Sequence, residues 1–280
     1  MNTETLEHVN CPICDQDQAR HLFTKDCLAV VECKNCGLRY VNPRMSVQSL
    51  ETNYIGHYYP QEKIELIYTN AMDCLQMRER LAEIERQMHK RGRLLDVGCG
   101  IGTFLHLARE RGWEIYGVDP SESGVSFARD QYGLDVFCGN LFGVNFPDQY
   151  FDAITLYHVL EHVPQVNPFL DELRRILKQK TGRLAVEVPN AGSIKSRLRQ
   201  EDWPYVHPRD HLYYFSHRTL SKLLHKHGFN WIRAGKPERV NPDREGTINV
   251  MKFNALRVVT AALVNLHLST VIRIYAGYDQ

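Results

Sequence analysis

A glycine-rich stretch between a buried strand and a helix constrains this chain more than any other feature. Residues 93–102 read Arg-Leu-Leu-Asp-Val-Gly-Cys-Gly-Ile-Gly, and the apolar run at 94–97 predicts a buried parallel strand. Beyond this stretch, apolar residues recur at helical spacing. Glycines in such a loop let the backbone approach a ligand closely, and the start of a helix offers unpaired N–H donors. The stretch therefore predicts a ligand-binding turn in an α/β fold.

The spacing of the glycines indicates which kind of ligand the turn binds. Gly98, Gly100 and Gly102 form G-x-G-x-G, whereas a dinucleotide site needs G-x-G-x-x-G. Asp96 stands two residues before the first glycine. A second predicted strand ends at Asp119, roughly 20 residues beyond the loop, where a carboxylate can accept hydrogen bonds from both hydroxyls of a ribose. The pattern predicts a cofactor that contains a ribose.

From residue 93 onward, short apolar runs alternate with helical patterns. This alternation predicts an α/β fold with a doubly wound, mostly parallel sheet, in which ligands bind beyond the carboxyl ends of the strands. The predicted strands cover 94–97, 114–119, 136–138, 151–156, 183–188, 231–234 and 270–276. The predicted helices cover 103–111, 121–131, 167–177, 217–227 and 250–266, and a polar loop covers 237–247.

The glycine loop and the residues after the following strands resemble the class I S-adenosylmethionine (SAM)-dependent methyltransferases. The glycine spacing with the preceding aspartate resembles motif I of that family, and residues 157–163, Tyr-His-Val-Leu-Glu-His-Val, resemble its motif after the fourth strand. The resemblance implies a seven-stranded Rossmann-like sheet and SAM as the cofactor. It also implies that the amide oxygen of Asn140 accepts a hydrogen bond from the adenine amino group. The implied cofactor-binding residues are Asp96, Gly98, Gly100, Gly102, Asp119, Asn140, Leu141, Tyr157 and His158.

Two C-x-x-C pairs near the N-terminus predict a four-thiolate zinc site. Eighteen residues separate the pair Cys11 and Cys14 from the pair Cys33 and Cys36, which fits the spacing of a zinc ribbon. Each short turn points two sulfurs the same way, and two turns complete a tetrahedron. A closed set of four ligands leaves no open position, so the metal is expected to be structural, with disulfides or reduced thiols as the alternatives. Cys27, between the pairs, is expected to be a spare buried thiol.

The chain is expected to divide into three parts. These are a zinc ribbon over 1–45, a helical connector over 46–92 and a methyltransferase domain over 93–280 with a lid segment at about 190–216. In the connector, apolar residues recur at helical spacing over 67–89, which predicts an amphipathic helix covering the sheet. The polar first ten residues lack the apolar core of a secretion signal, and the most apolar late stretch, 255–264, is too short to span a bilayer. A cytoplasmic protein is expected.

A second resemblance concerns the acceptor side of the site. Residues 210–216 read Asp-His-Leu-Tyr-Tyr-Phe-Ser, which is similar to a block in the sugar C-methyltransferases that carry a four-cysteine ribbon. In that family the histidine is a candidate base supported by the preceding acid, which implies these roles for His211 and Asp210. The family commonly has glutamate at the acidic position and a longer C-terminal domain, so the identity of the substrate is not carried over. His162, after the fourth strand, competes as the base, because an unperturbed imidazole titrates near about pH 6.5. For both histidines, packing or hydrogen bonding is the alternative role.

These features predict methyl transfer from SAM to a small-molecule acceptor, such as a sugar nucleotide or a natural-product intermediate, with O-, N- and C-methylation open. A divalent ion held by His158, Glu161 and His162 is an alternative, since a related group of quinone O-methyltransferases uses acid-rich residues in this block. Another is an RNA methyltransferase that grips nucleic acid through the ribbon. Against it, the formal net charge is +1 and the basic residues of 1–45 do not outnumber the acidic ones. A scaffold that binds SAM without turnover is the non-enzymatic alternative, and the oligomeric state stays open.

Overall fold

The main body of the protein is a seven-stranded sheet. The computed structural model describes residues 5–54, 64, 65, 68, 71–88, 90–235 and 270–278, so the predicted loop at 237–247 and helix at 250–266 lie outside the described residues. The strand order is β12-β13-β10-β9-β6-β7-β8. These strands are β6 (Arg93–Val97), β7 (Glu114–Asp119), β8 (Phe137–Cys138), β9 (Ala153–Tyr157), β10 (Arg183–Pro189), β12 (Trp231–Ala234) and β13 (Val271–Gly277).

The direction of the strands confirms the predicted fold class. The strands from β10 to β8 run parallel, and β13 and β12 complete the sheet in antiparallel orientation. Neighbouring residues of β6 enter different cores: Leu94 packs in one hydrophobic cluster and Leu95 in another. The central strands are therefore buried on both faces, which is why they read as continuous apolar runs in the sequence.

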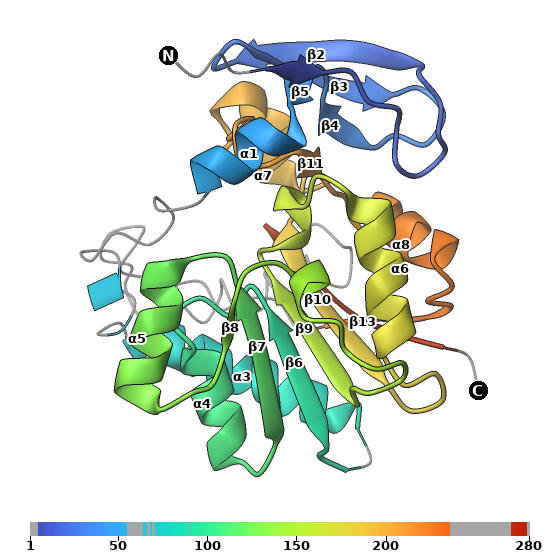
Figure 1. Ribbon diagram of the computed structural model, residues 1–280. Coiled ribbons are helices and arrows are strands. Elements are labelled where there is room, and N and C mark those ends of the chain that lie inside the picture. The colour runs from blue at the N-terminus through green and yellow to red at the C-terminus, as the bar shows by residue number, and fades with distance from the viewer. Residues whose placement is uncertain are drawn as a thin grey trace, which may run out of the picture.

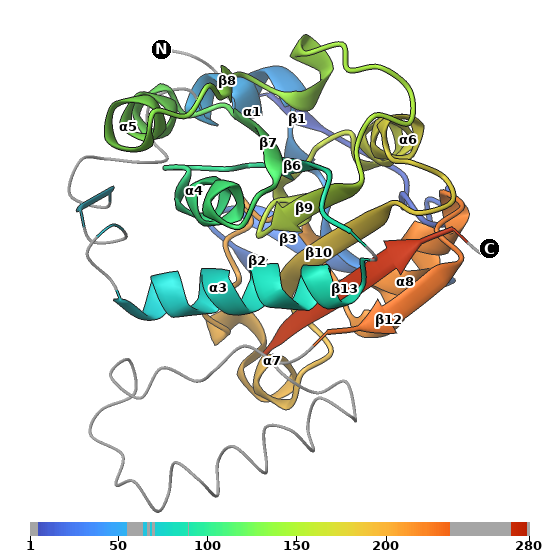
Figure 2. The same ribbon diagram turned by 90° about the horizontal axis from the view of Figure 1, so that it is seen from below.

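Helices cover both faces of the sheet (Figures 1 and 2). One face packs against α3 (Ala71–Arg86), α4 (Thr103–Glu110) and α5 (Glu122–Tyr132). The other face packs against α6 (Val166–Ile176) and α8 (His217–Lys226). Among the residues described, no helix combines the length and the apolar character needed to cross a bilayer.

The N-terminal segment forms a second, smaller sheet with the order β11-β4-β3-β2. Its strands are β2 (Ala19–Lys25), β3 (Leu28–Cys33), β4 (Arg39–Val41) and β11 (Tyr213–Tyr214). The short strands β1 (Leu6–Glu7) and β5 (Arg44–Met45) pair beside it, and α1 (Val47–Tyr54) follows. Strand β11 belongs to the predicted lid segment, which also contains α7 (Ile194–Arg199). The lid therefore adds a strand to the sheet of the four-cysteine segment.

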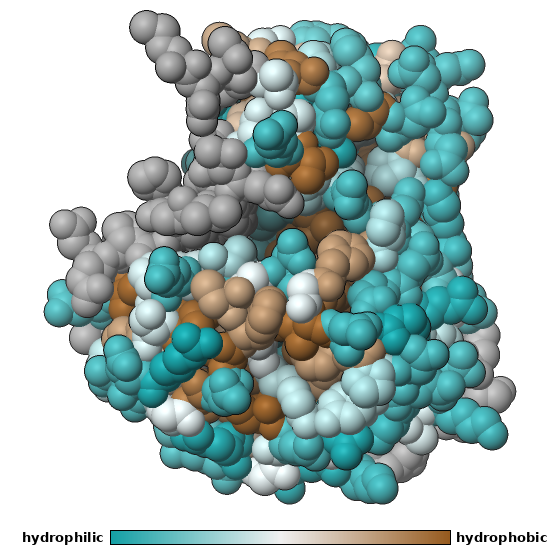
Figure 3. Space-filling view, in the orientation of Figure 1, coloured by the Kyte–Doolittle hydropathy of each residue, from teal (hydrophilic) through white to brown (hydrophobic). Residues whose placement is uncertain are grey.

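The small sheet lies over the end of the main sheet at which β9 terminates (Figure 1). Leu212 joins the two bodies, because its N–H donates to the Glu161 carbonyl at 2.8 Å and its carbonyl accepts from Val41 N–H at 3.0 Å. The buried Arg44 guanidinium donates to the Pro164 carbonyl at 2.9 Å and to the Tyr213 hydroxyl at 2.8 Å. Figure 3 shows a hollow with hydrophobic side chains between the two bodies.

The prediction that Cys27 is a buried thiol is wrong. Cys27 is exposed, because it lies at the tip of the hairpin between β2 and β3. Asp26 and Cys27 have φ values of 52° and 63°, and a two-residue turn with positive φ at both positions matches the twist of the flanking strands. Such a turn projects its side chains into solvent and away from a core.

Candidate functional site

The glycine loop connects β6 to α4 and is tied to the end of β7. Gly98 and Gly102 have φ values of 76° and 78°, a region that favours glycine. A Cβ atom at Gly98 would lie 2.5 Å from a methyl carbon of Val159, so the chains approach closely here. The Gly100 N–H donates to Oδ2 of Asp119 at 2.7 Å. The loop that the sequence predicted to bind the cofactor is thus held against the predicted ribose-binding carboxylate.

Two buried carboxylates lie beneath this loop. Asp119 also accepts a hydrogen bond from the Ser121 N–H at 2.8 Å, and burial raises its pKa. Asp96 accepts a hydrogen bond from the Thr155 hydroxyl at 2.6 Å. Burial raises the pKa of Asp96 to about 7, although that hydrogen bond opposes the rise. Because buried carboxylates favour a nearby positive charge, this place suits a cationic ligand group.

The other predicted cofactor contacts follow β8 and β9. Asn140 is exposed, and its amide oxygen accepts a hydrogen bond from the Gly143 N–H at 3.2 Å, which caps the short 3-10 helix that starts at the buried Leu141. A carbonyl oxygen has two lone pairs, so one is left for a second donor. The ring of Tyr157 packs edge-on against Phe104, with centroids 5.3 Å apart. Its side chain therefore faces the α4 layer.

His162 and His211 come together although 48 residues separate them in the sequence. Their rings lie edge to face, with centroids 4.6 Å apart. The Nδ1 atom of His162 lies 2.9 Å from the carbonyl of Asp210, and Nδ1 of His211 lies 2.8 Å from the carbonyl of Tyr205. A carbonyl only accepts, so each Nδ1 carries the hydrogen and each Nε2 keeps the lone pair of a neutral ring. The side chain of Asp210 is exposed, and this residue contacts the pair through its carbonyl.

The electrostatics of this pair favour the neutral form. Burial, together with the charge that His162 would carry, lowers the pKa of His211 to about 4. Burial also lowers the pKa of His162, although the carboxylate of Glu161 opposes that effect. At neutral pH both rings are therefore free of charge and able to accept a proton.

Glu161 lies next to this pair. A carboxylate oxygen of Glu161 and one ring nitrogen each of His162 and His211 lie within 4.8 Å of one another. The predicted divalent-ion alternative named His158 as the third member, but the group with this spacing contains His211 in its place. The ring of His158 lies between Glu161 and Glu187.

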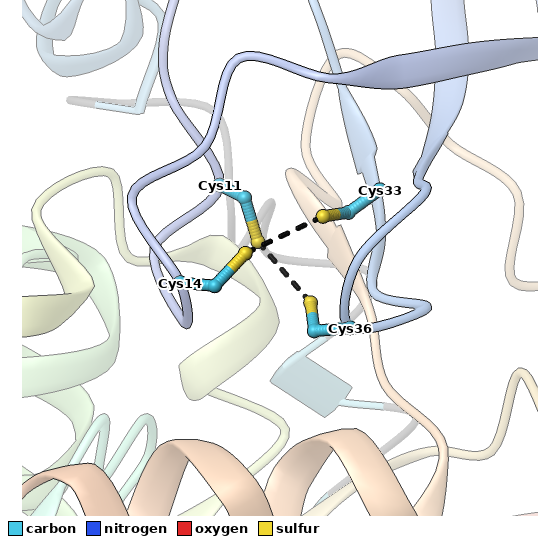
Figure 4. Close-up of side chains that lie close together, drawn as sticks. All are labelled: Cys11, Cys14, Cys33 and Cys36. Carbon is cyan, nitrogen blue, oxygen red and sulfur yellow. Dashed lines mark hydrogen bonds between the residues drawn. The ribbon is translucent and has the colours of Figure 1, made fainter.

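The four N-terminal cysteines gather in one cluster (Figure 4). The sulfurs of Cys11 and Cys36 are 3.4 Å apart, and those of Cys14 and Cys33 are 3.5 Å apart. A disulfide needs about 2.05 Å, so the four are free thiols and the disulfide alternative is wrong. Zinc–sulfur bonds of about 2.3 Å in a tetrahedron place sulfurs about 3.8 Å apart, close to what is observed.

A neighbouring hydroxyl also fits a metal in this cluster. The hydroxyl of Tyr40 is buried next to the cysteine cluster. Burial, together with the negative charge of Cys11 and Cys33, raises its pKa to about 12. The hydroxyl therefore keeps its hydrogen and can donate a hydrogen bond to a metal-bound thiolate, as is common around structural metal sites.

Comparison with known proteins identifies the domain that carries the loop and the histidines. Residues 68–234 match a protein family described as a methyltransferase domain. The chain belongs to this family. The match confirms the methyltransferase prediction for the domain, but it begins at residue 68 and leaves out the four cysteines. The zinc ribbon and the resemblance to sugar C-methyltransferases therefore stay predictions.

Curated relatives cover part of this methyltransferase. A ubiquinone biosynthesis O-methyltransferase of Bradyrhizobium diazoefficiens is 32% identical over 91 residues, which is 31% of this chain and 36% of the relative. An uncharacterized protein of Methanocaldococcus jannaschii is 38% identical over 114 residues, which is 41% of this chain and 48% of the relative. The chain thus spans less than half the length of either of these relatives.

Solved structures share the fold of this methyltransferase. A SAM-dependent methyltransferase from Archaeoglobus fulgidus has a TM-score of 0.55 and 22% identity, and the match covers 76% of this chain and 97% of the other. Phosphoethanolamine N-methyltransferase 2 of Haemonchus contortus, in complex with SAM, has a TM-score of 0.58 and 16% identity over 93% of this chain and 71% of the other. These likenesses confirm the predicted Rossmann-like sheet.

Sequence reasoning missed several residues that build the site. Tyr205 holds His211 through its carbonyl, and backbone atoms leave no signal in the residue type. Glu187 is fully buried within β10, and a charge inside an otherwise apolar parallel strand is the signal that could have revealed it.

Proposed function

We propose that this methyltransferase transfers a methyl group from SAM to a small-molecule acceptor. The observation that carries the proposal is the position of three groups at one end of the parallel strands. The glycine loop follows β6, Asp119 ends β7, and the pair His162–His211 packs on the turn after β9. In parallel sheets this edge is where ligands bind. The methyltransferase family of residues 68–234 supports the assignment.

In this proposal the loop and its neighbours hold the cofactor. The unpaired N–H groups at the start of α4, directly after the glycine loop, face its carboxylate end. Asp119 accepts hydrogen bonds from the ribose, Asn140 accepts one from the adenine, and Leu141 packs against the base. SAM supplies a methyl group that is already activated by a positively charged sulfur. Because burial disfavours a lone charge on Asp96, a cation bound beside it would favour its ionised form, and the two would stabilise each other.

The histidine pair accepts a proton from the acceptor in this proposal. Nε2 of His211 keeps its lone pair because the Tyr205 carbonyl fixes the hydrogen on Nδ1. His162 packs edge-on against this ring and holds its position. Such a base serves an acceptor that loses a proton from oxygen or carbon. The side chain of Asp210, exposed and next to His211, is free to contact the acceptor.

We further propose that the four cysteines hold a structural zinc ion. The set is closed and contains no position for a substrate. The ion stabilises the fold of β3 and β4, which pair with each other. Strand β4 also pairs with β11, which begins two residues after His211. In this way the ribbon positions the acceptor side of the site, while the cofactor side belongs to the main sheet.

Calorimetry with SAM and with S-adenosylhomocysteine tests the proposal. The protein should bind both, and Asp119→Asn should bind them about 10- to 100-fold more weakly, since hydrogen bonds to a charged group contribute about 1.5–3 kcal/mol. Asp130→Asn, at an exposed position of α5, is the matched control and should bind as the native protein does. Absence of binding heat on folded, zinc-replete protein would refute the proposal.

Turnover identifies the acceptor. Release of S-adenosylhomocysteine should be measured with nucleotide sugars, phenols and RNA. Turnover with a small molecule, lost in His211→Ala, supports the proposal. Turnover with RNA alone would replace the small-molecule acceptor, and SAM binding that is never followed by turnover would indicate a scaffold.

A further inference from the structure

The side chain of His158 lies between two buried carboxylates. Its Nδ1 atom is 3.4 Å from Oε1 of Glu161, and its Nε2 atom is 3.4 Å from Oε1 of Glu187. The two glutamates are 1% and 0% exposed. The backbone of His158 has a φ of 58°, an unfavourable conformation for a residue with a side chain. Such strain persists where the surrounding structure enforces it, and it often marks a functional position.

The chemistry of the two neighbours determines the charge of this ring. An ionised carboxylate only accepts hydrogen bonds, so a ring that faces one through each nitrogen must carry a hydrogen on both. Glu187 is ionised because Arg80 and Arg273 both form ion pairs with it. Although burial opposes a charged ring, the contacts with Glu161 and Glu187 raise the pKa of His158 to about 10. His158 is therefore an imidazolium cation at neutral pH.

Glu161 connects this cation to the histidine pair. Both of its carboxylate oxygens are buried. Its ion pair is with His158, and on its other side it approaches His162 and His211. Burial alone would favour the protonated acid, but the contact with the His158 cation lowers the pKa of Glu161. The carboxylate is thus ionised because of the cation behind it.

We propose that His158 is a positioning residue: clamped between Glu187 and Glu161, its imidazolium keeps Glu161 an ionised carboxylate that faces His162 and His211. This inference rests on the proposed function of that pair. When the acceptor reacts, its bond to hydrogen breaks and the proton moves to Nε2 of His211. The freed electron pair forms the bond to the methyl carbon, and the carbon–sulfur pair returns to sulfur. Glu161 stabilises the positive charge that His211 gains, and it does not take the proton itself.

Two carboxylates face His158: Glu161 on the turn after β9 and Glu187 on β10. A charge on His158 also acts on His162, and Glu187 in turn pairs with Arg80 on α3 and Arg273 on β13. Arg273 also pairs with Glu83 at 3.0 Å, so the two arginines balance the charges of Glu83 and Glu187. The charge of the His158 cation is then balanced by Glu161. The clamp needs both carboxylates.

Nuclear magnetic resonance tests the charge of the ring without any acceptor. Full-length, zinc-replete protein labelled with ¹⁵N-histidine is measured at pH 8, and the signals of His158 are assigned by their loss in His158→Asn. Asparagine suits this position, because it tolerates positive φ and carries no charge. Both ring nitrogens of His158 should be protonated at pH 8. A ring with one unprotonated nitrogen would overturn the inference.

Kinetics with the acceptor found in the turnover panel test the positioning role. His158→Asn should lower kcat about 10- to 100-fold, part of the effect of a positioned base, and leave the Kd for SAM within about threefold. The acid limb of its kcat profile should move to higher pH, because removing a cation raises the pKa of Glu161 and of both histidines of the pair. An unchanged kcat with an unchanged acid limb would overturn the inference.

A control variant separates this role from the general loss of a histidine–glutamate contact. In α4, Nε2 of His106 lies 3.4 Å from Glu110, the same separation as in the clamp, but on a face that solvent reaches. His106→Asn should leave kcat and its pH profile unchanged. If the native protein does not bind SAM, the proposed function is refuted. The charge of His158 is still decided by the magnetic resonance measurement, which needs neither SAM nor an acceptor.

Discussion

Replacing Gly102 with alanine should destabilise the protein by about 2–5 kcal/mol, and the structure shows where this comes from. Gly102 is the N-cap of α4 and has a φ of 78°. A side chain in this conformation costs about 1–2 kcal/mol. The new Cβ atom would also lie 2.8 Å from Cβ of Ala128 and 2.8 Å from Cδ1 of Leu134, closer than side-chain atoms approach. Relieving such overpacking costs about 1–3 kcal/mol more.

Gly112→Ala carries the conformational cost without the overpacking. Gly112 has a φ of 87°, but a Cβ atom there would meet nothing within 4 Å. This variant should therefore lose about 1–2 kcal/mol, the conformational cost alone. The difference between the two variants, about 1–3 kcal/mol, measures how closely α4 and α5 pack around the glycine loop.

Urea unfolding followed by circular dichroism and tryptophan fluorescence measures both variants. The midpoints should fall in the order native, Gly112→Ala, Gly102→Ala, with equal slopes. Gly102→Ala should also weaken SAM binding, because the start of α4 has to shift. Equal destabilisation of the two variants would refute the packing argument, and normal SAM affinity in Gly102→Ala would contradict the placement of the cofactor on this loop.

Three other predictions concern the metal, a buried acid and the contact between the two bodies. Removing the proposed zinc ion with a chelator should abolish turnover yet leave the Kd for SAM within about threefold, because the proposed cofactor residues belong to the main sheet. Metal analysis and calorimetry check this. Loss of SAM binding together with turnover would contradict it. Burial raises the pKa of Asp96 from 3.8 to about 7, so the folded protein holds a proton that the unfolded chain releases. This proton contributes to the free energy of unfolding below about pH 4, and the contribution is lost as the pH rises through 7. In Asp96→Asn the midpoint of urea unfolding should therefore fall less steeply over this pH range. Arg44→Met should lower the free energy of unfolding by about 1.5–3 kcal/mol, since the Pro164 carbonyl and the Tyr213 hydroxyl lose a charged hydrogen-bond donor. Arg20→Met, at an exposed ion pair, should change it by about 0–1 kcal/mol.

Local patterns in the sequence determined the main sheet. The strands predicted at 114–119 and 231–234 coincide with β7 and β12. The helices predicted at 103–111, 121–131, 167–177 and 217–227 differ from α4, α5, α6 and α8 by one residue at their ends. The cysteine spacing predicted the cluster that forms. The glycine loop and Asp119 were predicted to bind one ligand, and the hydrogen bond between Gly100 and Asp119 was found only in the structure. These features depend on hydrophobic periodicity, turn chemistry and short spacings, all of which act between residues close in the chain.

Tertiary structure alone decided the acceptor side of the site. The pairing of β11 with β4 joins segments more than 170 residues apart, and two tyrosines carry no signal for such a partner. His211 reaches His162 through this pairing, and His158 becomes a cation only because Glu161 and Glu187 meet it from two different elements. The physical reason is that packing and charge depend on which surfaces come into contact, and residue patterns along the chain specify the surfaces but not their partners.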